Sequence, residues 1–156
     1  MVVDIKVKQV AGFTVASLIH YGPHGPNMFR NEFDRLTKWA KKNKLRTGKW
    51  IMRWLDEPGN KPASKIRSDA CLEIKGKAKG EGKIQIKKFP KQTVLSVTFD
   101  PEEVSARLVY SGIYGWIRYS DFRTTDSPPR EVYADNPWRN RRAWANAEVQ
   151  VPVKRR

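Results

Sequence analysis

The sequence has one cysteine, Cys71, so no disulfide can form within the chain and the fold must be stabilised by a packed core. Cys71 lies in a run in which apolar residues alternate, at Ala70, Leu72 and Ile74. This pattern is typical of a small buried residue in a protein from a reducing compartment.

Long hydrophobic runs are also missing. No segment approaches the roughly 18 consecutive apolar residues that a membrane-spanning helix requires. The N-terminus alternates apolar and polar residues, at Val3, Ile5 and Val7, where a signal peptide would have an unbroken apolar stretch. We therefore expect a cytoplasmic protein without a membrane partner.

Acidic residues are scarce, with 16 Asp and Glu against 31 Lys and Arg, which gives a net charge of +15. Such an excess raises the hypothesis of nucleic-acid binding. The basic residues are scattered, however, and no known nucleic-acid-binding signature accompanies them. The main groups are Lys38, Lys41, Lys42 and Lys44; Lys75, Lys77 and Lys79; and Arg139, Arg141 and Arg142. We expect at most weak, sequence-independent nucleic-acid binding.

Metal and cofactor motifs are absent as well. The two histidines, His20 and His24, have no acid or cysteine beside them in sequence. The glycine-rich stretch 76–82 lacks the Gly-Lys-Ser/Thr ending and the helix of a phosphate-binding loop. We expect no metal and no cofactor.

The main feature that is present is an internal duplication. Ile5-Lys6-Val7-Lys8 reappears 79 positions later as Ile84-Gln85-Ile86-Lys87, and Thr14-Val15-Ala16-Ser17 reappears at the same distance as Thr93-Val94-Leu95-Ser96. Weaker matches at similar spacing pair Trp39 with Trp116, 54–58 with 133–137, and 69–74 with 146–151. This order predicts one domain over 1–156, made of internal repeats 1–79 and 80–156.

Each repeat has the same pattern of elements. Apolar alternation predicts strands over 3–10, 13–21, 49–55 and 69–75, and then over 83–89, 92–99, 130–134 and 146–153. The first two strands of each repeat are joined by short connections, Ala11-Gly12 and Pro90-Lys91. Turn residues, 58–60 and Pro137, end the third strand of each repeat.

One helix is predicted in each repeat. The first follows Gly25-Pro26, with Phe29, Phe33, Leu36 and Ala40 at helical spacing. The second is expected to begin at Asp100-Pro101, an N-cap acid followed by proline at the first helical position. The predicted fold is α+β: two tandem strand-strand-helix-strand-strand repeats that form one curved antiparallel sheet, with both helices on one face and pseudo-twofold symmetry.

Short motifs in this order resemble the GyrI-like, or bacterial effector-binding, family over nearly the whole chain. The motifs are His20-Tyr21-Gly22-Pro23, Asp56-Glu57-Pro58, 65–71, Glu81-Gly82, Arg130-Glu131-Val132-Tyr133, Asp135-Asn136-Pro137 and 149–153. The resemblance implies a central cleft between the helices that binds apolar and often cationic aromatic compounds. It also places the acids of the family on Glu131 and Glu148. Asp100-Pro101-Glu102-Glu103 stands where the family usually has a second Gly-Pro.

The duplication itself also singles out these two acids. Glu131 shares a strand face with Tyr133, whereas its counterpart Met52 shares a face with Trp50 and Trp54. Glu148 likewise stands opposite Cys71 in the repeat alignment. An acid where the other copy is apolar favours a ligand-binding role, because an unpaired buried carboxylate is costly. The alternative is an ion pair with Arg130 or Arg142.

Aromatic residues complete the predicted ligand site. A cation bound between ring faces gains about 0.5–2 kcal/mol from each ring. Tryptophan is also common core material. The candidate ligand-binding residues are Glu131, Glu148, Tyr133, Trp54, Trp116, Trp39, Trp50 and Met52.

Three functions remain open. The first is binding of a small hydrophobic, possibly cationic aromatic ligand. The second, suggested by the resemblance, is hydrolysis of strained electrophilic rings, in which Glu131 would act with Tyr133 or Tyr110. The third is an interaction with a protein partner, such as gyrase inhibition.

Overall fold

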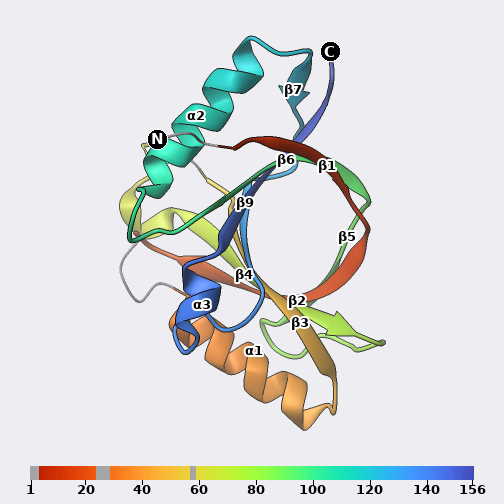
Figure 1. Ribbon diagram of the computed structural model, residues 1–156. Helices are drawn as coiled ribbons and strands as arrows, with labels where there is room; N and C mark the ends of the chain where they lie inside the picture. Colours follow the sequence, from red (N-terminus) through yellow and green to blue (C-terminus); the bar gives the residue numbers. More distant parts are fainter. Residues whose placement is uncertain (1–3, 24–28, 57–58) are drawn as a thin grey trace. The chain divides into compact units, whose positions relative to one another are not determined.

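The computed structural model describes residues 4–23, 29–56 and 59–156, and Figure 1 traces its strands and helices. Expectations that concern Val3, Gly25-Pro26 and Pro58 lie outside these residues. The predicted α+β class is confirmed. The chain forms two compact units. The middle unit is Phe13–Phe89, and the terminal unit combines the residues before Phe13 with Pro90–Arg156.

The middle unit is an antiparallel sheet with one helix. Its strands lie in the order β3 (Arg46–Trp54), β4 (Arg67–Lys75), β2 (Phe13–Tyr21) and β5 (Gln85–Phe89). Helix α1 (Arg30–Lys42) contacts β2 and β4 through buried Phe33, Leu36, Trp39 and Ala40. A short 3₁₀ helix, η1 (Ala63–Lys65), precedes β4. The apolar stripe at helical spacing in the sequence is therefore the core-facing side of α1.

The terminal unit has the same plan with two additions. Its strands lie in the order β1 (Lys6–Val10), β6 (Gln92–Phe99), β9 (Ala147–Arg155) and β8 (Arg130–Tyr133). Helix α2 (Ala106–Arg118) contacts β6 and β9. The additions, which the sequence pattern does not predict, are β7 (Phe122–Thr124), paired with the end of β9, and helix α3 (Arg141–Trp144).

The two strands that open each repeat pair in different units. β1 pairs with β6, and β5 pairs with β2. A two-residue hairpin of type I′ or II′ needs a positive φ in its turn, and neither Ala11-Gly12 nor Pro90-Lys91 has one. The short connections are therefore extended crossings between the units instead of hairpins.

The expected start of the second helix is wrong. Asp100 closes a separate turn, in which its carboxylate accepts a hydrogen bond of 2.9 Å from the Glu102 backbone N–H. The helix begins at Ala106, and its cap is Ser105, whose hydroxyl accepts a bond of 3.3 Å from the Leu108 backbone N–H. The Asp-Pro motif thus makes a turn before the helix and does not cap it.

The sheet of the terminal unit has two chemically different faces. Directly paired residues share a face, so Glu131 and its partner Val149 lie on one side, and Val132 and its partner Glu148 lie on the other. The Tyr110 side chain of α2 reaches Glu131, so we call the first side the α2 face and the second the reverse face.

No helix in the described part of the chain is long and apolar enough to cross a membrane.

Candidate functional site

Glu131 is the centre of the candidate site. It lies on β8 with only 7% of its surface exposed. Its carboxylate accepts long hydrogen bonds from two tyrosine hydroxyls, at 3.4 Å from Tyr110 on α2 and at 3.5 Å from Tyr133 on β8. The structure therefore brings Glu131, Tyr110 and Tyr133 together on the α2 face of the terminal unit. These are the three residues that the sequence analysis considered for ring hydrolysis.

Tyr133 is fixed by its surroundings. Its ring stacks on the Trp144 ring of α3, with centroids 6.2 Å apart and planes 3° from parallel. Burial, together with the charge and the hydrogen bond of Glu131, raises the pKa of Tyr133. The phenol therefore stays protonated at neutral pH and donates a hydrogen bond to the carboxylate.

A second tyrosine pair extends the cluster along α2. The Tyr110 and Tyr114 rings stack with centroids 6.4 Å apart. Tyr114 is exposed, whereas Tyr110 is half-buried. These rings lead from the Glu131 carboxylate toward the solvent, so the α2 face offers a charged centre with an aromatic approach.

Glu148 has a different environment. It lies on the reverse face and forms an ion pair of 2.5 Å with Lys8 of β1, while the Ser96 hydroxyl donates a bond of 2.6 Å and the Gln150 amide one of 2.9 Å. Burial acts to raise the pKa of Glu148, but the bonds from Lys8, Ser96 and Gln150 outweigh it and lower that pKa. Glu148 and Glu131 therefore lie on opposite faces of this sheet.

The candidate tryptophans are divided between the two units. Trp39, Trp50 and Met52 are buried in the middle unit, and the Trp50 ring lies 4.8 Å from that of Phe33. Trp54 is half-buried in the same unit, with its ring 5.8 Å from Phe29. Trp39, Trp50 and Met52 therefore belong to the core of the middle unit, and Trp54 packs against Phe29 just before α1.

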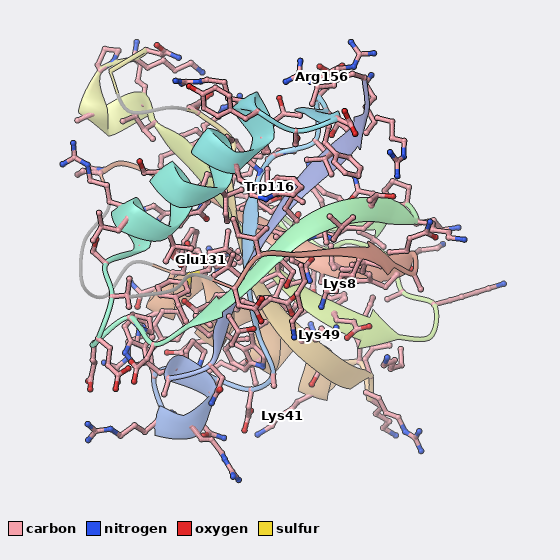
Figure 2. The ribbon with its side chains drawn as sticks, turned by 45° about the horizontal axis from the view of Figure 1, so that its top comes forward. Lys8, Lys41, Lys49, Trp116, Glu131 and Arg156 are labelled. Carbon is pink, nitrogen blue, oxygen red and sulfur yellow. The ribbon has the colours of Figure 1, made fainter. Side chains whose placement is uncertain are left out.

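Trp116 lies on α2 in the terminal unit and is 39% exposed. Its ring stacks on Phe122 of β7, with centroids 6.1 Å apart. Figure 2 labels Trp116, Glu131 and Lys8, so the reader can follow these positions. The exposed tryptophan thus contacts Phe122, whereas Glu131 accepts bonds from Tyr110 and Tyr133.

Two important residues were missed by the sequence reasoning. Trp144 lies in a helix of four residues, which is too short for a periodic signal. Lys8 pairs with an acid 140 positions away, but the repeat contains a signal for it: its counterpart Lys87 also pairs with a carboxylate, that of Asp69, at 3.1 Å. Lys8 on β1 and Lys87 on β5 thus each form an ion pair with a carboxylate of the unit in which their strand lies.

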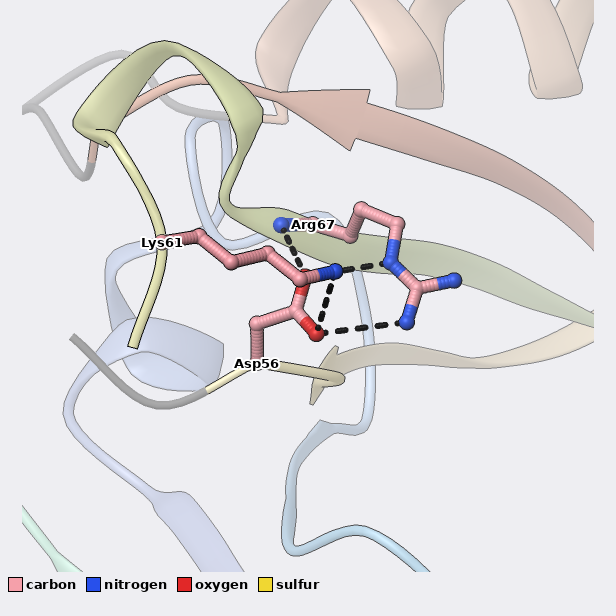
Figure 3. Close-up of polar contacts among 3 residues, drawn as sticks. All are labelled: Asp56, Lys61 and Arg67. Atoms are coloured by element: carbon pink, nitrogen blue, oxygen red, sulfur yellow. Dashed lines mark hydrogen bonds and ion pairs between the residues drawn. The ribbon is translucent and has the colours of Figure 1, made fainter. Parts of the chain in front are cut away.

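Asp56, in a motif that the family resemblance used, has a structural role (Figure 3). Its carboxylate accepts bonds from the Arg67 backbone N–H at 2.9 Å and from the Arg67 guanidinium at 3.0 and 3.2 Å, and Lys61 lies 3.3 Å away. These contacts, first of all the hydrogen bond from the Arg67 side chain, hold the pKa of Asp56 far below its usual range. The cluster joins the end of β3 to the start of β4.

Within the described residues, no group of three or more His, Cys, Asp or Glu side chains is placed to hold a metal ion. The remaining chemistry is that of the buried acid among aromatic rings, which is the chemistry of a small-molecule-binding domain.

The family model of the GyrI-like small molecule binding domain matches residues 3–154, so the chain belongs to this family. The expectation from the sequence motifs is confirmed, and ligand binding is the general function of the domain. No curated protein sequence matches the chain.

Solved structures agree with this fold. The crystal structure of the EcmrR C-terminal domain has a TM-score of 0.83 at 19% identity, with 100% of both chains covered. A hydrolase encoded by lin2189 from Listeria innocua has a TM-score of 0.65 at 8% identity, covering 96% of this chain and 91% of the other. SAV2435 bound to tetraphenylphosphonium has a TM-score of 0.58 at 12% identity, covering 97% and 94%.

Proposed function

We propose that the protein binds an apolar small molecule that carries a positive charge, with Glu131 as its charge partner. The observation that carries this proposal is the carboxylate of Glu131, buried on the α2 face and held by the hydroxyls of Tyr110 and Tyr133. Hydroxyl donors orient a carboxylate and leave its negative charge in place, so it still attracts a cation.

The aromatic surroundings favour a flat or multi-ring ligand. The stacked pairs Tyr133–Trp144 and Tyr110–Tyr114 supply ring faces and edges close to the acid. Ring faces attract cations and apolar rings alike. The structural relative SAV2435 was solved with tetraphenylphosphonium, a lipophilic cation, and this supports the same ligand class here.

The net charge of +15 does not oppose a cationic ligand. Exposed charges are screened over about 8 Å at physiological ionic strength, whereas a contact with a buried carboxylate is screened much less. The local acid therefore decides the preference of the site.

The test compares two ions of the same shape and opposite charge, tetraphenylphosphonium and tetraphenylborate, by calorimetric titration in sodium buffer. We expect the wild-type protein to prefer the phosphonium. Glu131→Gln keeps the shape of the side chain and removes its charge, so it should weaken phosphonium binding about ten- to hundredfold. Its melting temperature should change little, because the amide keeps the size of the side chain and can still accept the bonds from Tyr110 and Tyr133.

Glu148→Gln is the matched control, since it removes the same charge from the reverse face of the same sheet. It should leave phosphonium affinity unchanged and lower the melting temperature. Equal affinity of the wild-type protein for both ions, or equal losses in the two variants, would contradict the proposal.

A second candidate function is hydrolysis of a strained electrophilic ring in the same site. Glu131 would orient a water molecule, and the protonated Tyr133 hydroxyl would donate a hydrogen bond to the ring oxygen as it opens. Recovery of a bound epoxide unchanged after long incubation would exclude this function and leave the binding role intact.

A further inference from the structure

A second surface of the terminal unit combines positive charge with stacked rings, and the proposed ligand site does not use it. It consists of the end of α2, β7 and the end of β9, residues 116–125 and 153–156, and we call it the basic edge. These two segments contain one acid, Asp121, and five basic residues: Arg118, Arg123, Lys154, Arg155 and Arg156. All five basic residues are exposed.

The charges of the basic edge are not neutralised by carboxylates. Among the described residues, ion pairs join other lysines and arginines to acids, but none includes any of these five. Arg156 donates to the backbone oxygens of Ser120, at 3.1 Å, and Ile117, at 3.3 Å, at the end of α2. Figure 2 labels Arg156. The other four are available to an anionic partner.

Stacked side chains lie among these charges. The Arg155 guanidinium lies 5.0 Å from the centre of the Phe122 ring, and the Trp116 ring lies 6.1 Å from that of Phe122, with planes 26° apart. Trp116 remains 39% exposed, and Tyr119 in the adjoining turn is 88% exposed. The basic edge therefore presents aromatic surface to the solvent in addition to charge.

A cavity of about 250 Å³ adjoins this stack. Phe122 and Arg155 belong to both the stack and the cavity wall, and Lys154 and Lys8 are also part of the wall. Lys8 is paired with Glu148, so the hollow combines an aromatic ring with the cationic residues of β9, which suits a planar group linked to an anion.

We propose that the basic edge binds single-stranded nucleic acid, with unpaired bases stacked on Trp116 and phosphates held by Arg123, Lys154 and Arg155. Exposed aromatic rings interleaved with cations are the chemistry that binds unpaired nucleotides without sequence preference. A duplex keeps its base faces stacked on one another and would use only the charges. Five cations from three elements also exceed what one small anion needs.

The binding should be weak, sequence-independent and sensitive to salt. Each phosphate contact with a single strand contributes about −0.7 to the slope of log affinity against log salt. The three contacts would lower the affinity about 20-fold between 50 and 200 mM salt. This refines the expectation from the scattered charges in the sequence, because the structure gathers five of them at one edge.

The experiment measures fluorescence anisotropy of a labelled oligothymidine of about 20 nucleotides and of a duplex of the same length, in 50 and 200 mM salt. We expect tighter binding of the single strand. Trp116→Leu should lower its affinity about tenfold, since one base stack contributes roughly that much. Arg123→Gln/Lys154→Gln should lower the salt slope by about 1.4 units, the share of two contacts.

The matched control is Lys38→Gln/Lys41→Gln, which removes the same charge from exposed positions on α1 of the middle unit. It should change binding much less than the basic-edge pair. The melting temperature of every variant, measured by circular dichroism in parallel, tests folding independently of any ligand. Equal binding of duplex and single strand, equal losses in the two charge variants, or no binding in 50 mM salt would overturn the proposal.

Discussion

Glu131 and Glu148 lie on paired strands, and a difference of one position in register separates them by a sheet face. Glu131 pairs with Val149, whereas Glu148 pairs with Val132. The α2 face gives Glu131 two tyrosine hydroxyls, while the reverse face gives Glu148 a lysine, a serine and a glutamine. The same type of residue thus accepts hydroxyl bonds on one face and forms an ion pair on the other.

Glu148→Gln should destabilise the protein in a way that depends on pH. Because the folded-state pKa of Glu148 is lowered, its stabilising effect is present above the unfolded pKa, about 4.3, and is lost as the pH falls through the folded value. The difference in melting temperature between wild type and variant should therefore be largest near pH 6–7 and shrink toward pH 3.

Thermal unfolding followed by circular dichroism at a series of pH values measures this difference. Glu102→Gln is the control, because Glu102 and its partner Arg141 are both exposed, and such pairs contribute little. A difference for Glu148→Gln that stays constant from pH 7 to 3 would assign the loss to shape and not to charge.

At the scale of single elements, the sequence predicted eight strands correctly but not the start of the second helix. The eight expected strands are present, with ends shifted by a few residues, because alternation of apolar residues reports directly on a half-buried strand. The second helix start was missed because Asp100-Pro101 satisfies the rules for a cap while forming a turn of its own. Only the contacts in the folded protein show whether such a motif caps a helix or forms a separate turn.

Two glycines lie where another part of the chain comes close: Gly80, between β4 and β5, and Gly48, within β3. A Cβ atom on Gly80 would lie 2.5 Å from the backbone oxygen of Ile84, whereas one on Gly48 would meet the end of the Glu73 side chain. A backbone oxygen cannot turn aside, but a glutamate side chain can. We expect Gly80→Ala to cost about 1–3 kcal/mol of unfolding free energy.

Gly48→Ala should cost only about 1 kcal/mol, the contribution of the bond of 3.0 Å that Glu73 accepts from the Lys49 backbone N–H. Gly112→Ala is the control in an exposed helical position with open space around it, and it should stabilise the protein by about 1 kcal/mol. Denaturant unfolding of the three variants gives the order, and a larger loss for Gly48 than for Gly80 would contradict this reasoning.

At the scale of the whole chain, the boundaries of the compact units differ from those of the repeats in the sequence. The sequence repeat begins again near residue 80, yet β5 pairs within the middle unit and β1 pairs within the terminal unit. Periodicity finds strands that look alike, but it contains no information on which of two similar strands a partner takes. The family resemblance supplied the class of domain, whereas the pairing came only from the structure.

The exchange of β1 and β5 leads to an expectation for fragments. A fragment of residues 13–89 contains every strand of the middle unit, including β5, whose Lys87 pairs with Asp69. A fragment of residues 1–79, the first sequence repeat, lacks β5 and carries β1 without β6. In the second fragment Asp69, which is fully buried in the intact chain, keeps only Arg53 as an ion-pair partner, and the edge of β2 is uncovered.

We expect residues 13–89 to unfold with a cooperative thermal transition, and residues 1–79 to be largely unfolded or aggregated, since an uncovered strand edge and a poorly paired buried carboxylate both oppose folding. Circular dichroism melts and dispersion of amide proton signals distinguish the two states. Lys87→Gln within 13–89 should lower its melting temperature, because it removes one partner of Asp69. A fragment 1–79 as well folded as 13–89 would mean that repeat boundaries, and not strand exchange, define the folding units.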